Sequence, residues 1–408
     1  MRIYISGISG TGMGPLALFA KDAGYDVVGS DLAAGAVYDE LVKKGINVHI
    51  CAQDGQFFDQ QAAQGIDWFV YTSALSDTHA ELLRAKNQGI KTSKRDEFIN
   101  HLTQELNLKM VAVAGTHGKT TTTAMIIWTA TQLQLPVSYM VGTTLPFAPA
   151  GHYQPDAQFL IYEADEYDRN FLHFHPWLSA ITTVSYDHPD IYPTPTDYVQ
   201  AFQDFENQSN QVIRGDTAHP DVKLAGAVRR TDATIALAVI QSIARAINQD
   251  ISADRIISIL NQFPGVGRRF ERLMDGVYSD YGHHPEEISA TIQMALEESR
   301  LTGKKGVIAI YEPHQNTRQH QVRDGYKDAF AGVTKLFWLP TYLTREDETL
   351  AVLSPAEFIS ALSNAGIAEP AELDAQLLQK LQQYRDDGYL ILLMTAGPAD
   401  AWLRKTML

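Results

Sequence analysis

A glycine-rich segment in the middle of the chain has the composition of a loop that binds a triphosphate. Its residues are Gly115, Thr116, His117, Gly118, Lys119, Thr120 and Thr121. Glycine lets backbone N–H groups approach a phosphate closely, a lysine supplies positive charge, and a threonine hydroxyl can ligate Mg2+. Val113 stands where the usual pattern has its first glycine, so an incidental glycine-rich turn is the alternative. We expect the segment to bind a nucleotide, and His117 is either a phosphate or substrate contact or an ordinary loop residue.

Acidic residues follow a later apolar segment of the same region. The stretch EADEYD, residues 163–168, places four carboxylates within six residues, and these repel one another unless a cation or solvent compensates. Glu163 lies nearest the apolar segment, so we expect it to hold Mg2+, with a solvated acidic loop as the alternative. Asp187 and His188 follow the next apolar segment. Thr120, Glu163 and His188 are therefore the expected metal ligands, although Mg2+ prefers oxygen ligands to imidazole.

Four glycines near the N-terminus form a second candidate site. Gly7, Gly10, Gly12 and Gly14 follow the spacing G-x-x-G-x-G-x-G, which departs from the dinucleotide pattern G-x-G-x-x-G. Asp31 stands where a carboxylate that binds ribose is expected. Three interpretations stay open: an NAD site, a nucleotide diphosphate held at a helix N-terminus, and a structural tight turn.

The last third of the chain contains three polar stretches, FPGVGRRFE, YSDYGHHPEEI and YEPHQNTR. Their candidate residues are Arg268, Arg269, Asp280, His283, His284 and His314. The arginines could reach a phosphate, and the aspartate could contact a ribose. A zinc site is disfavoured because adjacent histidines rarely share one metal and the H-x-x-x-H spacing is missing from the sequence. We expect these groups to contact a substrate across a cleft.

These residues must be positioned by strands and helices, and apolar segments alternate with segments of helical spacing along the chain. This pattern predicts parallel sheets covered by helices. The predicted strands are Arg2–Ser6, Tyr25–Gly29, Trp68–Tyr71, Lys91–Ser93, Met110–Ala114, Phe159–Glu163, Ala180–Val184, Gly306–Tyr311, Lys335–Leu339 and Tyr389–Met394. Long helices are predicted over Ala225–Ile247 and Ala371–Tyr384. We expect three successive α/β units, with a hinge at Pro264 to Gly267.

The composition excludes several classes of protein. The chain has 408 residues, of which 33 are basic and 48 acidic, giving a formal net charge of −15. That balance argues against a non-specific nucleic-acid binder, which needs a basic face. A single cysteine, Cys51, excludes an intrachain disulfide and a cysteine-rich metal site. The N-terminus does not read as a signal peptide and the apolar runs are short, so we expect a cytoplasmic protein without nucleic-acid or membrane partners.

Together these motifs resemble the Mur ligase family, the ATP-dependent amide-forming ligases of peptidoglycan precursor synthesis. GISGTGMG is similar to the family's UDP-binding turn, and GTHGKTTTT to its ATP loop. EADEYD, the Asp–His pair, RRFE and DYGHHPEEI follow in the family's order. The resemblance implies an α/β fold of three domains. These are a Rossmann-like UDP-substrate domain at residues 1–107, a shortened P-loop ATPase domain at 108–263, and a Rossmann-like C-terminal domain at 264–408.

The resemblance also implies roles for individual residues. The UDP-linked substrate would contact Gly10, Thr11, Gly12, Met13 and Asp31. The incoming amino acid would face His283, His314 and Arg318. ATP would contact residues 115–121, Asp232, Arg269 and Asp280, and Mg2+ would contact Thr120, Glu163 and His188. The catalytic residues would be Lys119, Glu163, His188, Arg269 and His314.

The implied reaction joins an amino acid, with L-alanine expected, to the carboxylate of UDP-N-acetylmuramate. ATP and Mg2+ would convert the carboxylate to an acyl phosphate, which the amine then attacks, in a monomer or a homodimer. Three alternatives stay open. The chain could be a murein peptide ligase that attaches a recycled tripeptide to the same sugar, a catalytically impaired relative that binds UDP-sugar, or an NAD-linked oxidoreductase.

Three departures from the family pattern accompany the resemblance. Arg229 and Asp232 occupy the places of asparagines that help seat adenine. The segment from Gly215 to Leu224 is shorter than the family's insertion. The stretch from His314 to Arg318 reads HQNTR, whereas the members that add L-alanine carry a stretch like HRYTR.

Overall fold

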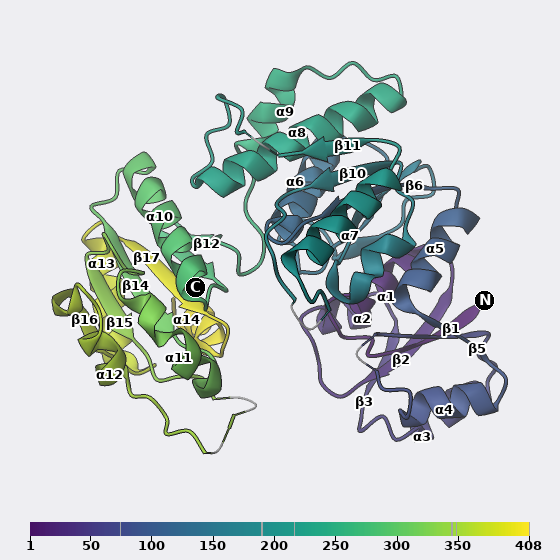
Figure 1. The fold of residues 1–408 in the computed structure, drawn as a ribbon, viewed down its shortest axis with the longest axis horizontal. Coiled ribbons are helices and arrows are strands. Elements are labelled where there is room, and N and C mark those ends of the chain that lie inside the picture. The colour runs from purple at the N-terminus through teal and green to yellow at the C-terminus, as the bar shows by residue number, and fades with distance from the viewer. Residues whose placement is uncertain (74, 189–190, 216, 344–345, 348, 408) are drawn as a thin grey trace. The chain divides into compact units, whose positions relative to one another are not determined.

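The structure is a computed structural model, and it describes residues 1–73, 75–188, 191–215, 217–343, 346–347 and 349–407. Within these residues the strands form three mostly parallel sheets (Figure 1). The chain divides into two compact units, Met1–Lys223 with Val228–Phe263, and Leu224–Ala227 with Pro264–Leu408. The first unit contains the first two sheets and the second unit contains the third. The sheets fall within the three predicted domain ranges, whose bounds stay predictions.

The first sheet has the strand order β3-β2-β1-β4-β5 and is parallel throughout. Its strands are β1 Arg2–Ser6, β2 Asp26–Asp31, β3 Asn47–Ile50, β4 Trp68–Tyr71 and β5 Lys91–Lys94, and its helices are α1 Met13–Asp22, α2 Tyr38–Lys43, α3 Gln56–Ala62, α4 Ala80–Asn87 and α5 Arg95–Glu105. Both faces of the central strand are buried, because Ile3 and Ile5 enter one core while Tyr4 enters the other. Helices cover both faces of parallel sheets, which explains the apolar run.

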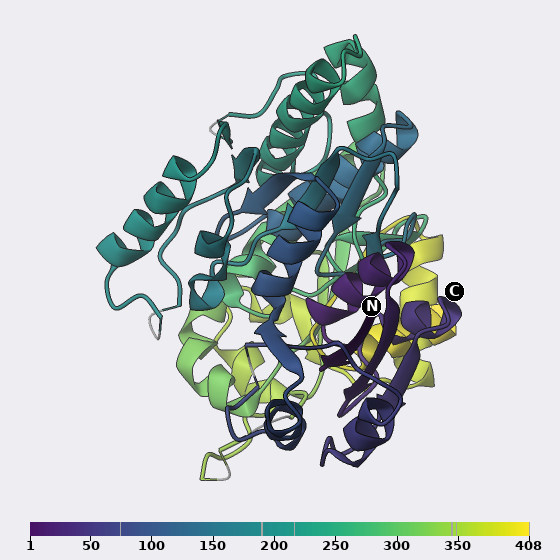
Figure 2. The ribbon, with the colours of Figure 1, turned by 90° about the vertical axis from the view of Figure 1, so that its right-hand side faces the viewer.

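The second sheet has the order β11-β10-β6-β9-β7-β8, with only the β7–β8 pair antiparallel among the described strands. Its strands are β6 Lys109–Ala114, β7 Val137–Met140, β8 Gly151–His152, β9 Phe159–Glu163, β10 Leu178–Ile181 and β11 Val212–Arg214. Its helices are α6 Lys119–Gln132, the 3-10 helix η1 Tyr167–His173, α7 Pro195–Asn207, α8 Ala227–Ala246 and α9 Ala253–Leu260. Side chains such as Phe19 and Tyr162 lie in one continuous core that joins this sheet to the first. Figure 2 shows the purple strands of the first sheet and the blue strands of the second within this unit.

The third sheet has the order β12-β13-β17-β14-β15-β16 and carries a separate core on each face. Its strands are β12 Glu271–Met274, β13 Val277–Asp280, β14 Val307–Glu312, β15 Lys335–Trp338, β16 Ala368–Pro370 and β17 Leu390–Thr395. Its helices are α10 Pro285–Leu301, α11 Asn316–Val322, α12 Pro355–Ser360, α13 Ala375–Asp386 and α14 Ala399–Met407, with the 3-10 helices η2 Arg323–Tyr326 and η3 Ala365–Ile367. Ile292 of α10 and Phe358 of α12 pack on one face, whereas Leu381 of α13 and Leu403 of α14 pack on the other.

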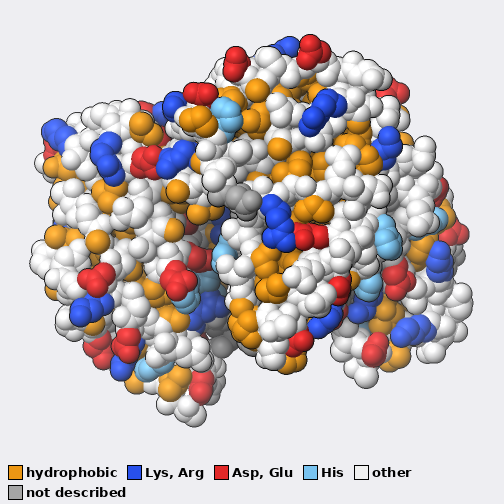
Figure 3. Space-filling view, turned by 45° about the horizontal axis from the view of Figure 1, so that its top comes forward, with side chains coloured by type: hydrophobic (Ala, Val, Ile, Leu, Met, Phe, Trp, Pro, Cys, Tyr) orange, Lys and Arg blue, Asp and Glu red, His pale blue; other side chains and the backbone are white. Residues whose placement is uncertain are grey.

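The face of the molecule seen in Figure 3 carries charges of both signs, and its acidic and basic side chains are interspersed. None of the helices in the described part of the chain combines the length and the apolar character that crossing a bilayer requires.

The predicted segment Ala180–Val184 differs from the strand that forms. Strand β10 spans Leu178–Ile181, and the chain leaves the sheet at Thr182, whose hydroxyl donates to the carbonyl of His117. The strand ends there because the following residues hold the phosphate loop instead of pairing with a neighbour.

Candidate active site

The predicted phosphate loop connects β6 to α6, as strand–loop–helix spacing requires. Gly115 has φ +140° and Gly118 has φ +84°, a backbone conformation that favours glycine. A Cβ at Gly115 would overlap Thr182 Oγ1. The loop therefore needs glycine at this position both for its backbone angle and for its close packing.

Residues after β10 hold the loop in place. The N–H of Thr116 donates to the carbonyl of Thr183 at 2.8 Å, and the N–H of His117 donates to Thr183 Oγ1 at 3.0 Å. The hydroxyl of Thr116 donates to the carbonyl of Ser185 at 2.7 Å. The loop is thus fixed by contacts with an adjacent strand end, which suits a preformed anion site.

Lys119 is the first residue of α6, and its ammonium group turns back over the loop. Its Nζ donates to the carbonyl of Gly115 at 2.5 Å and to Glu166 Oε1 at 2.9 Å. Glu166 is almost completely buried, and burial raises the pKa of its carboxyl group while Lys119 acts in the opposite direction. Lys119 therefore already neutralises one buried anion at the place where phosphates are expected.

Thr120 and Glu163 lie in contact beside the loop. Thr120 Oγ1 donates to Glu163 Oε1 at 2.6 Å, and the N–H of Gly142 donates to Glu163 Oε2 at 2.9 Å. Glu163 ends β9, directly beside Val113 of β6 in the sheet. A hydroxyl and a carboxylate oxygen at one point suit Mg2+, which takes few protein ligands and keeps several waters.

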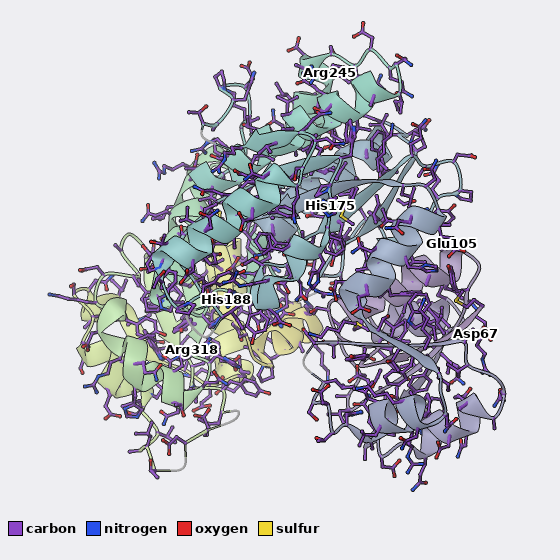
Figure 4. All side chains as sticks on the ribbon, turned by 45° about the vertical axis from the view of Figure 1, so that its right-hand side comes forward. Asp67, Glu105, His175, His188, Arg245 and Arg318 are labelled. Carbon is purple, nitrogen blue, oxygen red and sulfur yellow. The ribbon has the colours of Figure 1, made fainter. Side chains whose placement is uncertain are left out.

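His188, labelled in Figure 4, lies beside Glu166. Its Nε2 is 3.7 Å from Glu166 Oε1 and 3.8 Å from Asp187 Oδ2. Within the described residues, no cluster of three or more His, Cys, Asp or Glu side chains is arranged to hold a metal. Of the three predicted metal ligands, Thr120 and Glu163 are in contact with each other. The role of His188 as a ligand stays a prediction.

A cavity of about 190 Å³ joins the two sheets of the first unit. Thr11 and Gly12 of the N-terminal turn line it, together with Lys119 and Glu163. Arg95 also lines this cavity, and it was not expected from the sequence. The two predicted sites, which lie about a hundred residues apart in the chain, thus open into one space.

The N-terminal turn is shaped by Asp31. Its carboxylate accepts the N–H of Ser9 and the N–H of Leu32, both at 2.7 Å. The N–H of Gly10 donates to the carbonyl of Gly7 at 3.0 Å, and α1 begins with the buried Met13. The structure therefore gives Asp31 a local role in holding the turn, and its contact with a substrate stays a prediction.

Asp232 lies under the phosphate loop. It is 3% exposed on α8, and a Cβ placed on Gly118 would be 2.7 Å from its Oδ1. Burial raises the pKa of its carboxyl group to about 7, while Thr122 and Arg229 act in the opposite direction. The residue is packed against the loop backbone, and its predicted contact with adenine remains untested.

In the second unit, Asp280 ends β13 and is nearly buried. Its carboxylate accepts the N–H groups of Phe270 and Gly282, each at 2.7 Å, and the hydroxyl of Thr291 at 3.2 Å. These donors engage both oxygens, so Asp280 holds the segment that contains Arg269. The guanidinium of Arg269 lies 5.4 Å from the ring centroid of Tyr281.

His283 and His314 lie together in the second unit, with ring centroids 5.8 Å apart. Burial lowers the pKa of both imidazoles, and the positive charge of Arg318 adds to this effect. The Nδ1 atom of His314 is buried without a hydrogen-bond partner among the described residues. Arg318, labelled in Figure 4, lies on α11. The three predicted amino-acid contacts therefore form one cluster, in which two imidazoles of lowered pKa lie near the charge of Arg318.

Comparison with known proteins identifies the family. The model of the Mur ligase family, catalytic domain, matches residues 2–106, and that of the Mur ligase middle domain matches residues 113–235. A UDP-N-acetylmuramate–L-alanine ligase of Fusobacterium nucleatum subsp. nucleatum is 30% identical over 417 residues, which cover 86% of this chain and 86% of the relative. The chain belongs to the Mur ligase family.

Solved structures of other Mur ligases have the same fold. The UDP-N-acetylmuramate–alanine ligase of Thermotoga maritima is 22% identical, with a TM-score of 0.77, and the match covers 100% of this chain and 98% of the other. A murein peptide ligase of Psychrobacter arcticus is 20% identical, with a TM-score of 0.58 over 100% and 98% of the two chains. These likenesses confirm the predicted α/β fold with successive sheets.

Two site residues of this Mur ligase were not predicted from its sequence. Glu166 stands within EADEYD. The prediction favours Glu163 because it lies nearer the strand, but the turn after β9 brings Glu166 back to Lys119. Arg95 follows β5 directly, and side chains just beyond the carboxyl ends of parallel strands commonly line ligand sites. That rule could have identified Arg95.

Proposed function

We propose that this chain is an ATP-dependent ligase that joins L-alanine to the carboxylate of UDP-N-acetylmuramate, through an acyl phosphate. The observation that carries the proposal is one shared cavity lined by Gly12 of the N-terminal turn, Lys119 of the phosphate loop and Glu163 at the end of β9. An enzyme that activates a sugar-linked acid with ATP needs the two substrates to meet in such a space. The named activity of the Fusobacterium relative supports the same reaction.

The residues of the loop suit phosphoryl transfer. When ATP binds, the ammonium group of Lys119 would weaken its ion pair with Glu166 and neutralise charge on the transferred phosphate. Thr120 and Glu163 would hold Mg2+, which when bound neutralises phosphate charge. Glu163 is already oriented by the N–H of Gly142, so this ligand needs little rearrangement.

The cluster in the second unit suits an amino acid. An attacking amine must be uncharged, and the lowered pKa values of His283 and His314 keep both imidazoles neutral near pH 7. A neutral imidazole can accept a hydrogen bond from the amino group, and Arg318 can pair with the amino acid's carboxylate. We therefore propose that these three residues face the incoming amino acid.

Phosphate release tests the proposal. The assay combines UDP-N-acetylmuramate and Mg-ATP with L-alanine, glycine, L-serine or the peptidoglycan tripeptide. We expect release to require all three substrates and to be fastest with L-alanine. Faster release with the tripeptide would assign the chain to murein peptide ligation instead. Binding of UDP-N-acetylmuramate without release, or protection by NADH without ATP turnover, would overturn the proposal.

A further inference from the structure

Arg95 lies in the cavity at the junction of the two sheets. It is the first residue of α5, directly after β5, and its side chain is 21% exposed. Its guanidinium packs over the N-terminal turn, since a Cβ on Gly12 would overlap Arg95 Nη1. The same cavity is lined by Lys119 and Glu163. Arg95 therefore reaches the space between the predicted sugar and ATP sites.

The acidic groups around Arg95, Tyr162 first and then Asp165, raise the pKa of its guanidinium although burial opposes them, so the side chain stays charged. Its Nη2 is 3.8 Å from Asp165 Oδ2, which is too long for a hydrogen bond. In the described part of the chain this is its one ion pair, and its side chain makes no hydrogen bond to protein. A guanidinium has five N–H donors, so one that stays charged and makes no hydrogen bond to the described residues can donate to an incoming anion.

Of the other charged groups that line the cavity, Asp165 faces Arg95 at 3.8 Å, and the remaining two have hydrogen-bond partners. Lys119 contacts Glu166 and two loop carbonyls, and Glu163 accepts from Thr120 and Gly142. The neighbouring Lys94 lies 3.4 Å from Asp168 Oδ2 and is not among the residues that line the cavity. Arg95 is thus the cation of the cavity lining that an incoming anion can engage with the least competition.

We propose that Arg95 binds the carboxylate of the acid substrate and presents it to the terminal phosphate of ATP. This inference rests on the proposed function. The planar guanidinium can donate two parallel N–H···O hydrogen bonds to a carboxylate, which fixes the orientation of the carboxylate as well as its position. Arg95 could instead bind the diphosphate of UDP. Two ligands that share the diphosphate but differ in the carboxylate distinguish these two roles.

Binding measured by titration calorimetry, without turnover, tests the assignment. The ligands are UDP-N-acetylmuramate and UDP-N-acetylglucosamine, which lacks the lactyl carboxylate. We expect R95A to weaken binding of the first about tenfold to a hundredfold and to leave the second unchanged. R95K should retain part of the affinity for UDP-N-acetylmuramate, because lysine keeps the positive charge but cannot donate two parallel hydrogen bonds. K94A is the matched control, since its ion pair lies outside the cavity, and it should bind both ligands normally.

Each outcome has a defined meaning. Equal weakening for both ligands in R95A and R95K would place Arg95 at the diphosphate and overturn the proposal. Unchanged affinities with normal turnover in R95A would also overturn it, while leaving the ligase function intact. Failure of the wild-type chain to bind UDP-N-acetylmuramate would instead remove the proposed function on which the inference rests. If R95A does not fold, the comparison of the two ligands is made with R95K instead.

Discussion

Lys119 and Glu166 form a buried ion pair beneath the phosphate loop. Lys119 Nζ is 2.8 Å from Glu166 Oε2, and the two side chains are 16% and 2% exposed. Removing one partner of such a pair leaves a buried charge without compensation, which costs about 3–5 kcal/mol. The pair therefore links the stability of the first unit to the residue expected to contact ATP.

This link predicts that stability and activity respond differently to substitution. K119A should lower the free energy of unfolding by about 3 kcal/mol, because Glu166 loses its cation. The double variant K119A/E166Q should regain most of that stability, since the buried group is then neutral, yet remain inactive. Urea unfolding and phosphate release measure the two properties. If K119A/E166Q turned over ATP, Lys119 would have no part in the reaction.

Asp232 predicts a pH dependence of stability. Burial raises the pKa of its carboxyl group from 3.8 to about 7. Between these values the unfolded chain is ionised while the folded chain keeps its proton, so the free energy of unfolding falls as pH rises, and the loss is complete above about pH 7. The variant D232N has no such ionisation. Its stability relative to the wild type should therefore increase from pH 4 to pH 7 by at most about 4 kcal/mol.

Urea unfolding of both proteins at several pH values measures this difference. D275N is a control of opposite sign, because Lys304 lowers the pKa of Asp275 below 3.8. That variant should lose stability relative to the wild type as pH rises towards about 4 and should change little from there to pH 7. A stability difference between D232N and the wild type that does not vary with pH would show that Asp232 is ionised throughout. In that case the carboxylate would have a cationic partner in solution.

At the scale of elements, the turn before α6 depends on Gly118. This residue has φ +84°, and a Cβ there would lie 2.7 Å from Asp232 Oδ1. Gly65 is a matched control, with φ +90° and no atom within 4 Å of an added Cβ. G65A should cost only the backbone strain, about 1–2 kcal/mol. G118A should cost more and also weaken ATP binding, because the loop must shift away from α8.

Thermal unfolding and nucleotide titration of both variants separate the two costs. We expect G65A to bind ATP like the wild type. Equal affinities in G118A and the wild type would mean that the loop tolerates the displacement, and that Asp232 does not fix its position.

The elements that position the site were predicted where local sequence determines them. The strand, glycine turn and helix around Lys119 follow from an apolar run and glycine spacing, and β6 and α6 form there. Strand β13 was missed, because Val277–Asp280 is short and half polar and becomes a strand only through its neighbours β12 and β17. Arg95 was missed for a similar reason. Its position directly after β5 marks it as a residue at the edge of the sheet, but its contact with Gly12 depends on packing between segments far apart in the chain.

The whole molecule consists of two units with separate cores, and the chain passes between them more than once. Leu224–Ala227 belongs to the second unit, whereas Val228–Phe263 belongs to the first. Within the second unit, the N–H of Gly226 donates to Glu297 Oε2 at 2.8 Å. A fragment that begins at Pro264 would lack this contact, so the units are best studied in the full chain.

The separate cores predict two unfolding transitions in calorimetry. The phosphate loop, Thr120 and Glu163 all belong to the first unit, so Mg-ADP should raise the midpoint of one transition and leave the other in place. A ligand at a hundred times its Kd adds about 2.7 kcal/mol to the stability of the unit that binds it. The variant K119A/E166Q identifies the responsive transition, because it should lose the shift while keeping both transitions. A single transition that moves as a whole with Mg-ADP would mean that the two cores unfold together, and the stability of the loop would then depend on every element of the chain.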